Sequence, residues 1–178
     1  AENLFWSEGA VTRAAREARN GHPGLIVWLT GLSGAGKSTI ALALERQLFA
    51  SGRQVYLIDG DNLRHGLNAG LGFSAADRRE NIRRAGEAAR LLAEAGQIVI
   101  TAFISPFAAD CDRVRSILEP GRFLEVFVNA PVEVCKTRDP KGLYARAERV
   151  YLDGGIAYDR HDARFQPKSD FEIGQGAN

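Results

Sequence analysis

The hydrophobic positions of this chain fall into four short, nearly continuous runs separated by longer and more polar stretches. Turn-forming residues such as Gly31 and Gly60 follow closely after the runs. Continuous apolar runs of this length are typical of strands that are buried on both faces. The predicted strands are Leu25–Leu29, Val55–Ile58, Ile98–Ile104 and Phe123–Val128.

Helical patterns occupy the stretches between these runs. In Ser38–Ala50, apolar residues recur at a spacing of four, and Gly52 follows as a stop signal. Ser74–Ala95 starts with a candidate N-cap and carries an apolar stripe of Ile82, Ala85, Ala89 and Leu92. Shorter helices are predicted at Asp110–Leu118 and Val132–Thr137. Strands that alternate with helices predict the α/β class, with a mainly parallel sheet flanked by helices.

The length and composition of the chain indicate one domain with flanking segments. The chain has 178 residues, with 23 Lys plus Arg against 22 Asp plus Glu, for a net charge of +1. We divide it into an N-terminal segment (1–24), a domain (25–152) and an irregular C-terminal tail (153–178). The charge balance excludes a polyanion-coating protein, so we expect no nucleic-acid partner. We find neither a membrane span nor a signal sequence, and the two cysteines lack metal or redox spacing, which favours a cytoplasmic protein.

The strongest chemical signal follows the first predicted strand. Gly31-Leu32-Ser33-Gly34-Ala35-Gly36-Lys37-Ser38-Thr39 matches the phosphate-binding loop pattern Gly-x-x-x-x-Gly-Lys-[Ser/Thr] between a strand and a helix. Its glycines allow backbone N–H groups to converge on phosphates, and the following helix adds its positive end. Lys37 is expected at the β- and γ-phosphates and the Ser38 hydroxyl on Mg²⁺. The alternative is a plain strand-to-helix turn. The complete motif favours a nucleoside triphosphate site.

Two carboxylates follow the second predicted strand. Asp59 and Asp61 should face the same crevice, because ligands of open parallel sheets bind beyond the carboxyl ends of the strands. Asp59 is a candidate Mg²⁺ ligand and Asp61 a candidate for orienting or deprotonating an attacking hydroxyl. The alternative is that both residues cap the next turn. Among the following cations, Arg64 and Arg78 are candidates for gripping a second, anionic substrate, whereas Arg83 and Arg84 fit a solvated helix face.

Several segments resemble the adenylyl-sulfate kinase family. They are Asn3–Trp6, Asp59–Asn68, Leu71–Ser74, Asp77–Asn81, Ala102–Pro106 and Arg138–Tyr144. The resemblance implies a three-layer P-loop kinase fold and transfer of the γ-phosphoryl group of ATP, with Mg²⁺, to the ribose 3′-hydroxyl of adenosine 5′-phosphosulfate (adenylyl sulfate). It also implies a homodimer, and a possible sulfate adenylyltransferase domain or partner.

The resemblance further implies roles for individual residues. Arg64, Arg78 and Asn81 match positions that hold the phosphosulfate end, and Phe73 matches a ring that stacks on the substrate adenine. Residues on the same pocket are Ile104, Ser105, Lys141, Gly142 and Leu143, while Arg138 is a candidate for the ATP adenine side. Trp28 and Phe103 are interpreted as core residues.

Ser105 matches a family serine described as a phosphate carrier. Its position at a strand end fits a site role, but a serine nucleophile needs an adjacent base, and the sequence offers no obvious partner. We therefore predict direct in-line transfer, with Ser105 as a polar wall of the adenylyl-sulfate pocket.

The chain departs from the family pattern after Arg149. The usual lid segment is missing there, and Val150–Asp153 resembles the late strand that normally follows it. Either the lid is absent or residues are omitted at 149–150. Two alternative functions stay open at this point: a kinase for another small metabolite, and a catalytically weak nucleotide-binding module that regulates or is fused to sulfate adenylyltransferase.

Overall fold

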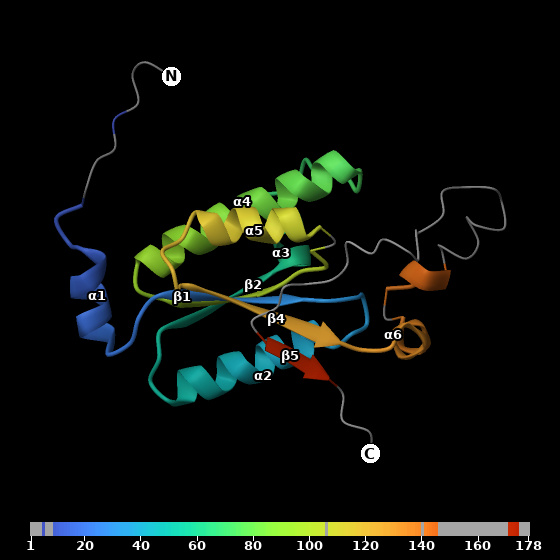
Figure 1. Cartoon of the computed structure of the whole chain (residues 1–178), viewed down its shortest axis with the longest axis horizontal. Helices are drawn as coiled ribbons and strands as arrows, with labels where there is room; N and C mark the ends of the chain where they lie inside the picture. The colour runs from blue at the N-terminus through green and yellow to red at the C-terminus, as the bar shows by residue number, and fades with distance from the viewer. Residues whose placement is uncertain (1–4, 6–8, 106, 140, 146–170, 175–178) are drawn as a thin grey trace.

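The computed structural model describes residue 5 and residues 9–105, 107–139, 141–145 and 171–174. Within these residues the elements follow one another in the alternating order that the sequence predicts (Figure 1). They are α1 (Arg13–Asn20), β1 (Leu25–Thr30), α2 (Lys37–Ala50), β2 (Val55–Asp59), α3 (Gly60–Arg64), α4 (Ala75–Glu94), β3 (Ile98–Ala102), α5 (Ala108–Ser116), β4 (Phe123–Asn129), α6 (Val132–Arg138) and β5 (Phe171–Gly174). No helix in this part of the chain is both long and apolar enough to cross a membrane.

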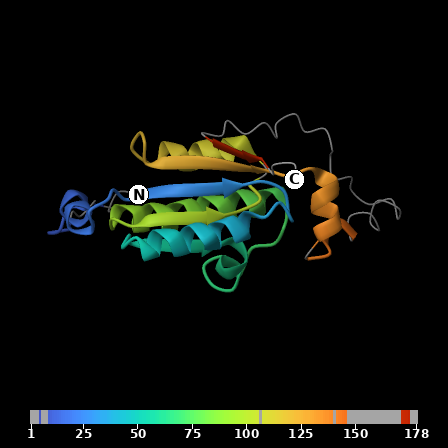
Figure 2. The same ribbon diagram turned by 90° about the horizontal axis from the view of Figure 1, so that it is seen from below.

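The strands form one parallel sheet in the order β2-β3-β1-β4-β5. The phosphate-loop strand β1 is therefore central, between β3 and β4. Helix α2 covers one face of the sheet, and α4 with α5 covers the other, which gives three layers (Figure 1). Figure 2 shows α1 and α6 at opposite ends of the sheet, so the loops after the strands gather beside α6. The predicted α/β architecture is confirmed.

The core is divided by the sheet into two clusters. Ile26 and Trp28 of β1 pack toward α4 and α5, whereas Val27 and Leu29 pack toward α2. This alternation is the strand periodicity of two, and it explains why β1 is apolar from Leu25 to Leu29. Both free cysteines are buried, Cys111 in the first cluster and Cys135 in the second.

Helix α4 follows the local signals closely. The Ser74 side chain accepts a hydrogen bond from the Asp77 N–H at 3.1 Å, as an N-cap does. Its glycine at position 86 faces α5, where a Cβ would lie 2.6 Å from Cγ2 of Val114. The two helices therefore depend on this glycine for their close approach.

Two sequence expectations need correction. The third strand was predicted to reach Ile104, but β3 ends at Ala102, where the chain turns away from the strand ladder. The tail 153–178 was predicted to be irregular, and this is wrong for Phe171–Gly174, which pairs in parallel with Val126–Asn129 as β5. A four-residue strand at a sheet edge forms mainly because its backbone pairs with the neighbouring strand, and a local hydrophobic pattern does not predict such pairing. The expected late strand at Val150–Asp153 and the lid junction at 149–150 lie outside the described residues.

Candidate active site

A cavity of about 760 Å³ opens at the carboxyl ends of the parallel strands. It is lined by the loop after β1, the turn from β2 into α3, the start of α4, the end of β3, and the side chains of Arg138, Lys141 and Leu143. Among the described lining residues, five side chains are cationic and two are acidic. The cationic ones are Lys37, Arg64, Arg78, Arg138 and Lys141, and the acidic ones are Asp59 and Asp61.

The loop between β1 and α2 needs its glycines for two reasons. Gly31 and Gly34 have φ values of 143° and 78°, which L side chains rarely adopt. A Cβ on Gly31 would also lie 2.7 Å from the Val128 oxygen, and one on Gly34 would lie 2.8 Å from the Cys135 oxygen. Gly36 then serves as the N-cap of α2 without a side-chain cap, so the first turn of the helix keeps N–H groups available for an anion.

Lys37 is buried at the first position of α2. Its side chain folds back, and Nζ donates to the Gly31 oxygen at 2.9 Å and to the Leu32 oxygen at 2.7 Å. Burial, with a smaller contribution from the nearby Lys141 charge, lowers the pKa of Lys37 to about 8. The residue is therefore an ammonium group held at the cavity wall with its charge poorly hydrated.

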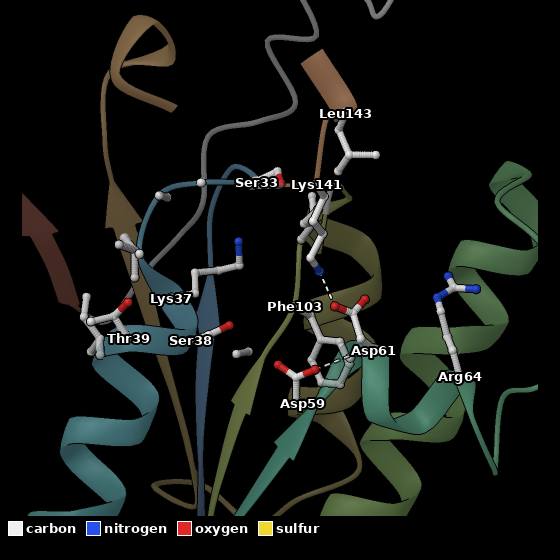
Figure 3. Close-up of a pocket in the computed structure, with 18 of the residues that line it drawn as sticks. Ser33, Lys37, Ser38, Thr39, Asp59, Asp61, Arg64, Phe103, Lys141 and Leu143 are labelled. Carbon is white, nitrogen blue, oxygen red and sulfur yellow. Dashed lines mark hydrogen bonds and ion pairs between the residues drawn. The ribbon is translucent and has the colours of Figure 1, made fainter. Parts of the chain in front are cut away.

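The two predicted metal ligands lie on opposite sides of the cavity mouth. Figure 3 shows Ser38, beside Lys37, facing the carboxylate of Asp59. Asp59 is also the N-cap of α3, since Oδ1 accepts from the N–H groups of Asp61 and Asn62. The capping alternative thus holds for one oxygen of Asp59. A hydroxyl and a carboxylate oxygen are the hard donors that Mg²⁺ prefers. The described residues contain no group of three or more His, Cys, Asp or Glu side chains arranged for a metal.

Asp61 projects into the cavity and forms an ion pair with Lys141 (Figure 3). Both side chains are more than half exposed, at 59% and 52%. The pair joins the first turn of α3 to the segment after α6, which is 80 residues away in the sequence. Sequence reasoning expected both residues at the site but did not anticipate this contact.

A second group of side chains lies on the far side of Asp61. The Arg64 guanidinium stands 4.4 Å from the centroid of the Phe73 ring, and Nη1 donates to the Leu71 and Gly72 oxygens. Arg78 donates from Nε to the Phe73 oxygen at 2.9 Å. Asn81, one turn further along α4, is 7% exposed and also lines the cavity. Two arginines, an aromatic ring and an amide are thereby brought together.

The cavity excludes some predicted residues and includes others that were missed. Ser105 does not line it; the side chain is buried, and Oγ accepts a hydrogen bond from Nε1 of Trp28 at 2.9 Å. Ser105 thus contacts β1 rather than the cavity, because β3 ends at Ala102, and its role as a polar wall of the adenylyl-sulfate pocket stays a prediction. Gly31, Leu32 and Gly142 also stay outside the lining, whereas the predicted Ser33, Ala35, Thr39, Ile104 and Leu143 belong to it.

The missed lining residues are mainly apolar: Ile40, Gly60, Ile82, Ala102, Phe103 and Val128. Phe103 has two roles, since it stacks on Trp28 at 5.0 Å between ring centroids and also reaches the cavity. Apolar residues in predicted strands and helices are assigned to the core, so the sequence alone does not identify the ones that also line a cavity.

The last residue of α6 and the segment that follows it support the phosphate loop from outside. The Tyr144 hydroxyl donates to the Ser33 oxygen at 3.0 Å, and Nη1 of Arg138 donates to the Gly34 oxygen at 3.3 Å. The Asp139 carboxylate accepts from the N–H groups of Leu143, Tyr144 and Ala145. An Asp four residues before a helical turn is a local capping signal, so the sequence could have predicted this turn but not its contacts with the phosphate loop.

Comparisons with known proteins agree on one family. A family model described as "Adenylylsulphate kinase" matches residues 23–160. A curated "Adenylyl-sulfate kinase" of Yersinia pestis is 58% identical over 158 residues, which cover 89% of this chain and 74% of the relative. Another, of Geotalea daltonii, is 57% identical over 167 residues, covering 93% of this chain and 82% of the relative. The solved structure of a Mycobacterium tuberculosis APS kinase "in complex with AMPPNP and APS" is similar with a TM-score of 0.76 and 42% identity, over 88% of this chain and 91% of that one.

Proposed function

The chain belongs to the adenylylsulphate kinase family, and from this premise we propose that it transfers the γ-phosphoryl group of ATP to the ribose 3′-hydroxyl of adenosine 5′-phosphosulfate. The products are ADP and 3′-phosphoadenosine 5′-phosphosulfate, the activated form of sulfate. One observation carries the proposal for the site. Asp61 stands between Lys37 of the phosphate loop and Arg64 of the second cationic group, within a single cavity (Figure 3).

On the donor side, the loop Gly31–Thr39 holds the triphosphate. Its N–H groups and the N-terminus of α2 face the phosphate oxygens, and Lys37 leaves the Gly31 and Leu32 carbonyls to contact the β- and γ-phosphates. Since transfer of a phosphoryl group needs positioning and charge neutralisation more than covalent help, these contacts supply most of the catalysis on this side. Arg138, which borders the same loop, lies against the adenine of ATP.

Mg²⁺ accompanies ATP in this proposal, with Ser38 and the second carboxylate oxygen of Asp59 as the protein groups that hold it, directly or through water. The fit rests on the donor set: one hydroxyl and one carboxylate are too few for an all-protein cage, and Mg²⁺ of kinases is bound by one or two such groups together with substrate phosphates. When bound, the ion neutralises charge that develops on the phosphate oxygens.

On the acceptor side, Arg64, Arg78 and Asn81 bind the phosphosulfate, and Phe73 offers a ring face to the adenine. Guanidinium groups match the planar arrays of anionic oxygens that a phosphosulfate presents. Ile104 and Leu143 supply apolar walls, and Lys141 adds a further charge.

Asp61 orients the 3′-hydroxyl and accepts its proton as the oxygen attacks the γ-phosphorus. Substrate binding must first separate Asp61 from Lys141, which frees the carboxylate for the hydroxyl and the ammonium group for the anionic ligand. Ser105 takes no covalent part, since its hydroxyl is buried and occupied by Trp28. Transfer is therefore direct and in line.

Three wider features belong to the same proposal. A homodimer and a possible sulfate adenylyltransferase partner follow from the family resemblance alone, and size-exclusion chromatography with light scattering tests the first. A cytoplasmic location is supported by the two free, buried cysteines, which suit a reducing compartment.

A coupled assay of ATP consumption tests the function. Wild-type protein is given Mg-ATP with adenylyl sulfate, and in parallel with adenosine, AMP or gluconate. We expect turnover with adenylyl sulfate only. Equal turnover with AMP would contradict the assigned acceptor, and tight binding of adenylyl sulfate without turnover would favour a regulatory nucleotide-binding module.

A further inference from the structure

Two buried asparagines meet behind the acceptor side of the cavity. Asn68, in the connection between α3 and α4, is 0% exposed, and its Nδ2 donates to Oδ1 of Asn81 at 3.0 Å. Asn81 lies in the second turn of α4 and lines the cavity, whereas Asn68 does not. Asn68 is therefore removed from the ligand but touches a residue that faces it.

This contact fixes the polarity of the Asn81 amide. Its oxygen is occupied by Asn68, so its nitrogen is the polar end that remains for the cavity, and in the described part of the chain Nδ2 of Asn81 donates to no acceptor. The reverse arrangement, with both amides turned over, would present an oxygen to the cavity. An oxygen repels an anionic substrate, whereas an N–H group donates to it.

The unsatisfied atom of the pair favours the observed arrangement. Oδ1 of Asn68 is buried without a hydrogen-bond partner among the described residues. Turning both amides over would place the two N–H donors of Asn68 at that position instead. Buried orphan donors are rarer in proteins than orphan carbonyl oxygens, so leaving the oxygen unsatisfied is the less costly choice.

The backbone of Asn68 also organises the loop that carries other acceptor-side groups. Its N–H donates to the Leu63 oxygen at 2.8 Å, and its carbonyl accepts from the Leu71 N–H at 3.0 Å. The carbonyls of Leu71 and Gly72 in turn accept from Arg64. These backbone bonds hold the side chain of Asn68 at a fixed place beneath α4.

We propose that Asn68 is a positioning residue for the acceptor nucleotide: it holds Oδ1 of Asn81 so that Asn81 presents its N–H group to the anionic phosphosulfate. The inference rests on the proposed function, since it concerns the substrate that Asn81 contacts. It adds a residue whose side chain acts through Asn81 and thereby determines the preference for an anionic ligand.

The variant Asn68→Asp tests this polarity. The introduced carboxylate has the shape of the amide but can only accept, so Asn81 must turn its N–H group away from the cavity. We expect the KM for adenylyl sulfate to rise about tenfold or more, while the KM for ATP changes less than about twofold. Ala69→Asp places the same charge on the adjacent, exposed residue and should leave both KM values unchanged. Equal increases in both KM values for Asn68→Asp would overturn the proposal.

A second variant guards against loss of folding. Asn68→Ser is too short to reach Asn81, and it should raise the KM for adenylyl sulfate in the wild-type background but not in Asn81→Ala. An undiminished effect in Asn81→Ala would show a general structural role and overturn the proposal.

Nuclear magnetic resonance gives a readout that is independent of activity. In the ligand-free protein we expect slow solvent exchange of the Asn68 side-chain amide protons and fast exchange for those of Asn81. The opposite pattern would overturn the proposal. If the wild type fails to use adenylyl sulfate, the proposed function fails, and the exchange pattern still decides the orientation of Asn81.

Discussion

Replacing Lys37 with methionine should stabilise the ligand-free protein at neutral pH while abolishing phosphoryl transfer. The buried Lys37 has a pKa of about 8, against 10.5 for a solvated lysine. Between these two pH values the unfolded chain binds more protons than the folded one, so stability rises with pH through this window. Below pH 8 the folded protein carries a charge that burial disfavours. The difference between these two pKa values corresponds to about 3 kcal/mol of unfolding free energy.

Urea unfolding of wild type and Lys37→Met at a series of pH values measures this effect. The free energy of unfolding of the variant minus that of the wild type should be largest at pH 7 and should shrink by about 2 kcal/mol by pH 9.5, because Lys37 loses its proton in the folded state over this range. Taking the difference cancels groups that titrate alike in both proteins. A difference that stays constant from pH 7 to 9.5 would refute the depressed pKa.

Binding of ATP gives an independent test of the same lysine. Phosphate charges favour the ammonium form, so Lys37 should regain its proton when the nucleotide binds. At pH 8.5 a pKa of about 8 leaves about a quarter of the ligand-free molecules protonated, so binding should take up about three quarters of a proton. Calorimetry in buffers of different ionisation enthalpy measures this uptake, which should vanish in Lys37→Met.

Four further predictions concern single residues. Arg78→Ala should raise the KM for adenylyl sulfate by a factor equivalent to about 1.5–3 kcal/mol, with little change in the KM for ATP. Equal changes of both KM values in steady-state assays would contradict the assignment of Arg78 to the acceptor side. Asp61→Asn should lower kcat by about 10²–10⁴ with weaker effects on binding; a near-normal kcat would remove Asp61 from the mechanism. Ser105→Ala should retain most of kcat but lose about 1–3 kcal/mol of unfolding free energy, because the indole N–H of Trp28 is left without its acceptor. With ATP that is chiral at the γ-phosphorus, the phosphoryl group should be transferred with inversion of configuration. Net retention would instead indicate a covalent intermediate. Gly86→Ala should destabilise the protein by about 1–3 kcal/mol in thermal unfolding, since the new Cβ would lie too close to Val114. An unchanged Tm would mean that α5 can shift away from α4 at little energetic cost.

Local patterns in the sequence were sufficient for most of the fold. The four apolar runs became β1 to β4. The inner strands β1 and β3 are covered on both faces and are therefore almost entirely apolar, whereas the edge strand β2 leaves Tyr56 exposed, so its apolar run did not mean burial on both faces. The apolar stripe of α4 and its Ser74 cap are equally local, and the helix begins where the cap predicts. Strand β5 was missed because its place beside β4 depends on pairing across more than 40 residues of chain.

The sequence predicted which residues gather at the site better than it predicted what they contact. The glycine-rich motif and the residues after β2 lie at the cavity because strand ends in a parallel sheet meet at one edge. The contact of Ser105 was not anticipated, because its partner, Trp28, comes from a different strand, 77 residues earlier. The Asp61–Lys141 pair and the link from Asn68 to Asn81 likewise depend on packing between elements, which no spacing rule encodes.

The excess of cationic side chains around the cavity has a consequence for the speed of encounter. The net charge of the chain is only +1, so its long-range electrostatic attraction for an anion is weak. Among the described residues, the cavity gathers five cationic side chains against two acidic ones where the phosphate loop and the arginines converge, and its low-dielectric walls focus the field outward. A nucleotide is therefore guided over the last ten or so ångströms, about one Debye length at 0.1 M salt, and capture should slow as ionic strength rises. The rate of substrate capture is thus set by the charges that line the cavity and not by the net charge of the chain.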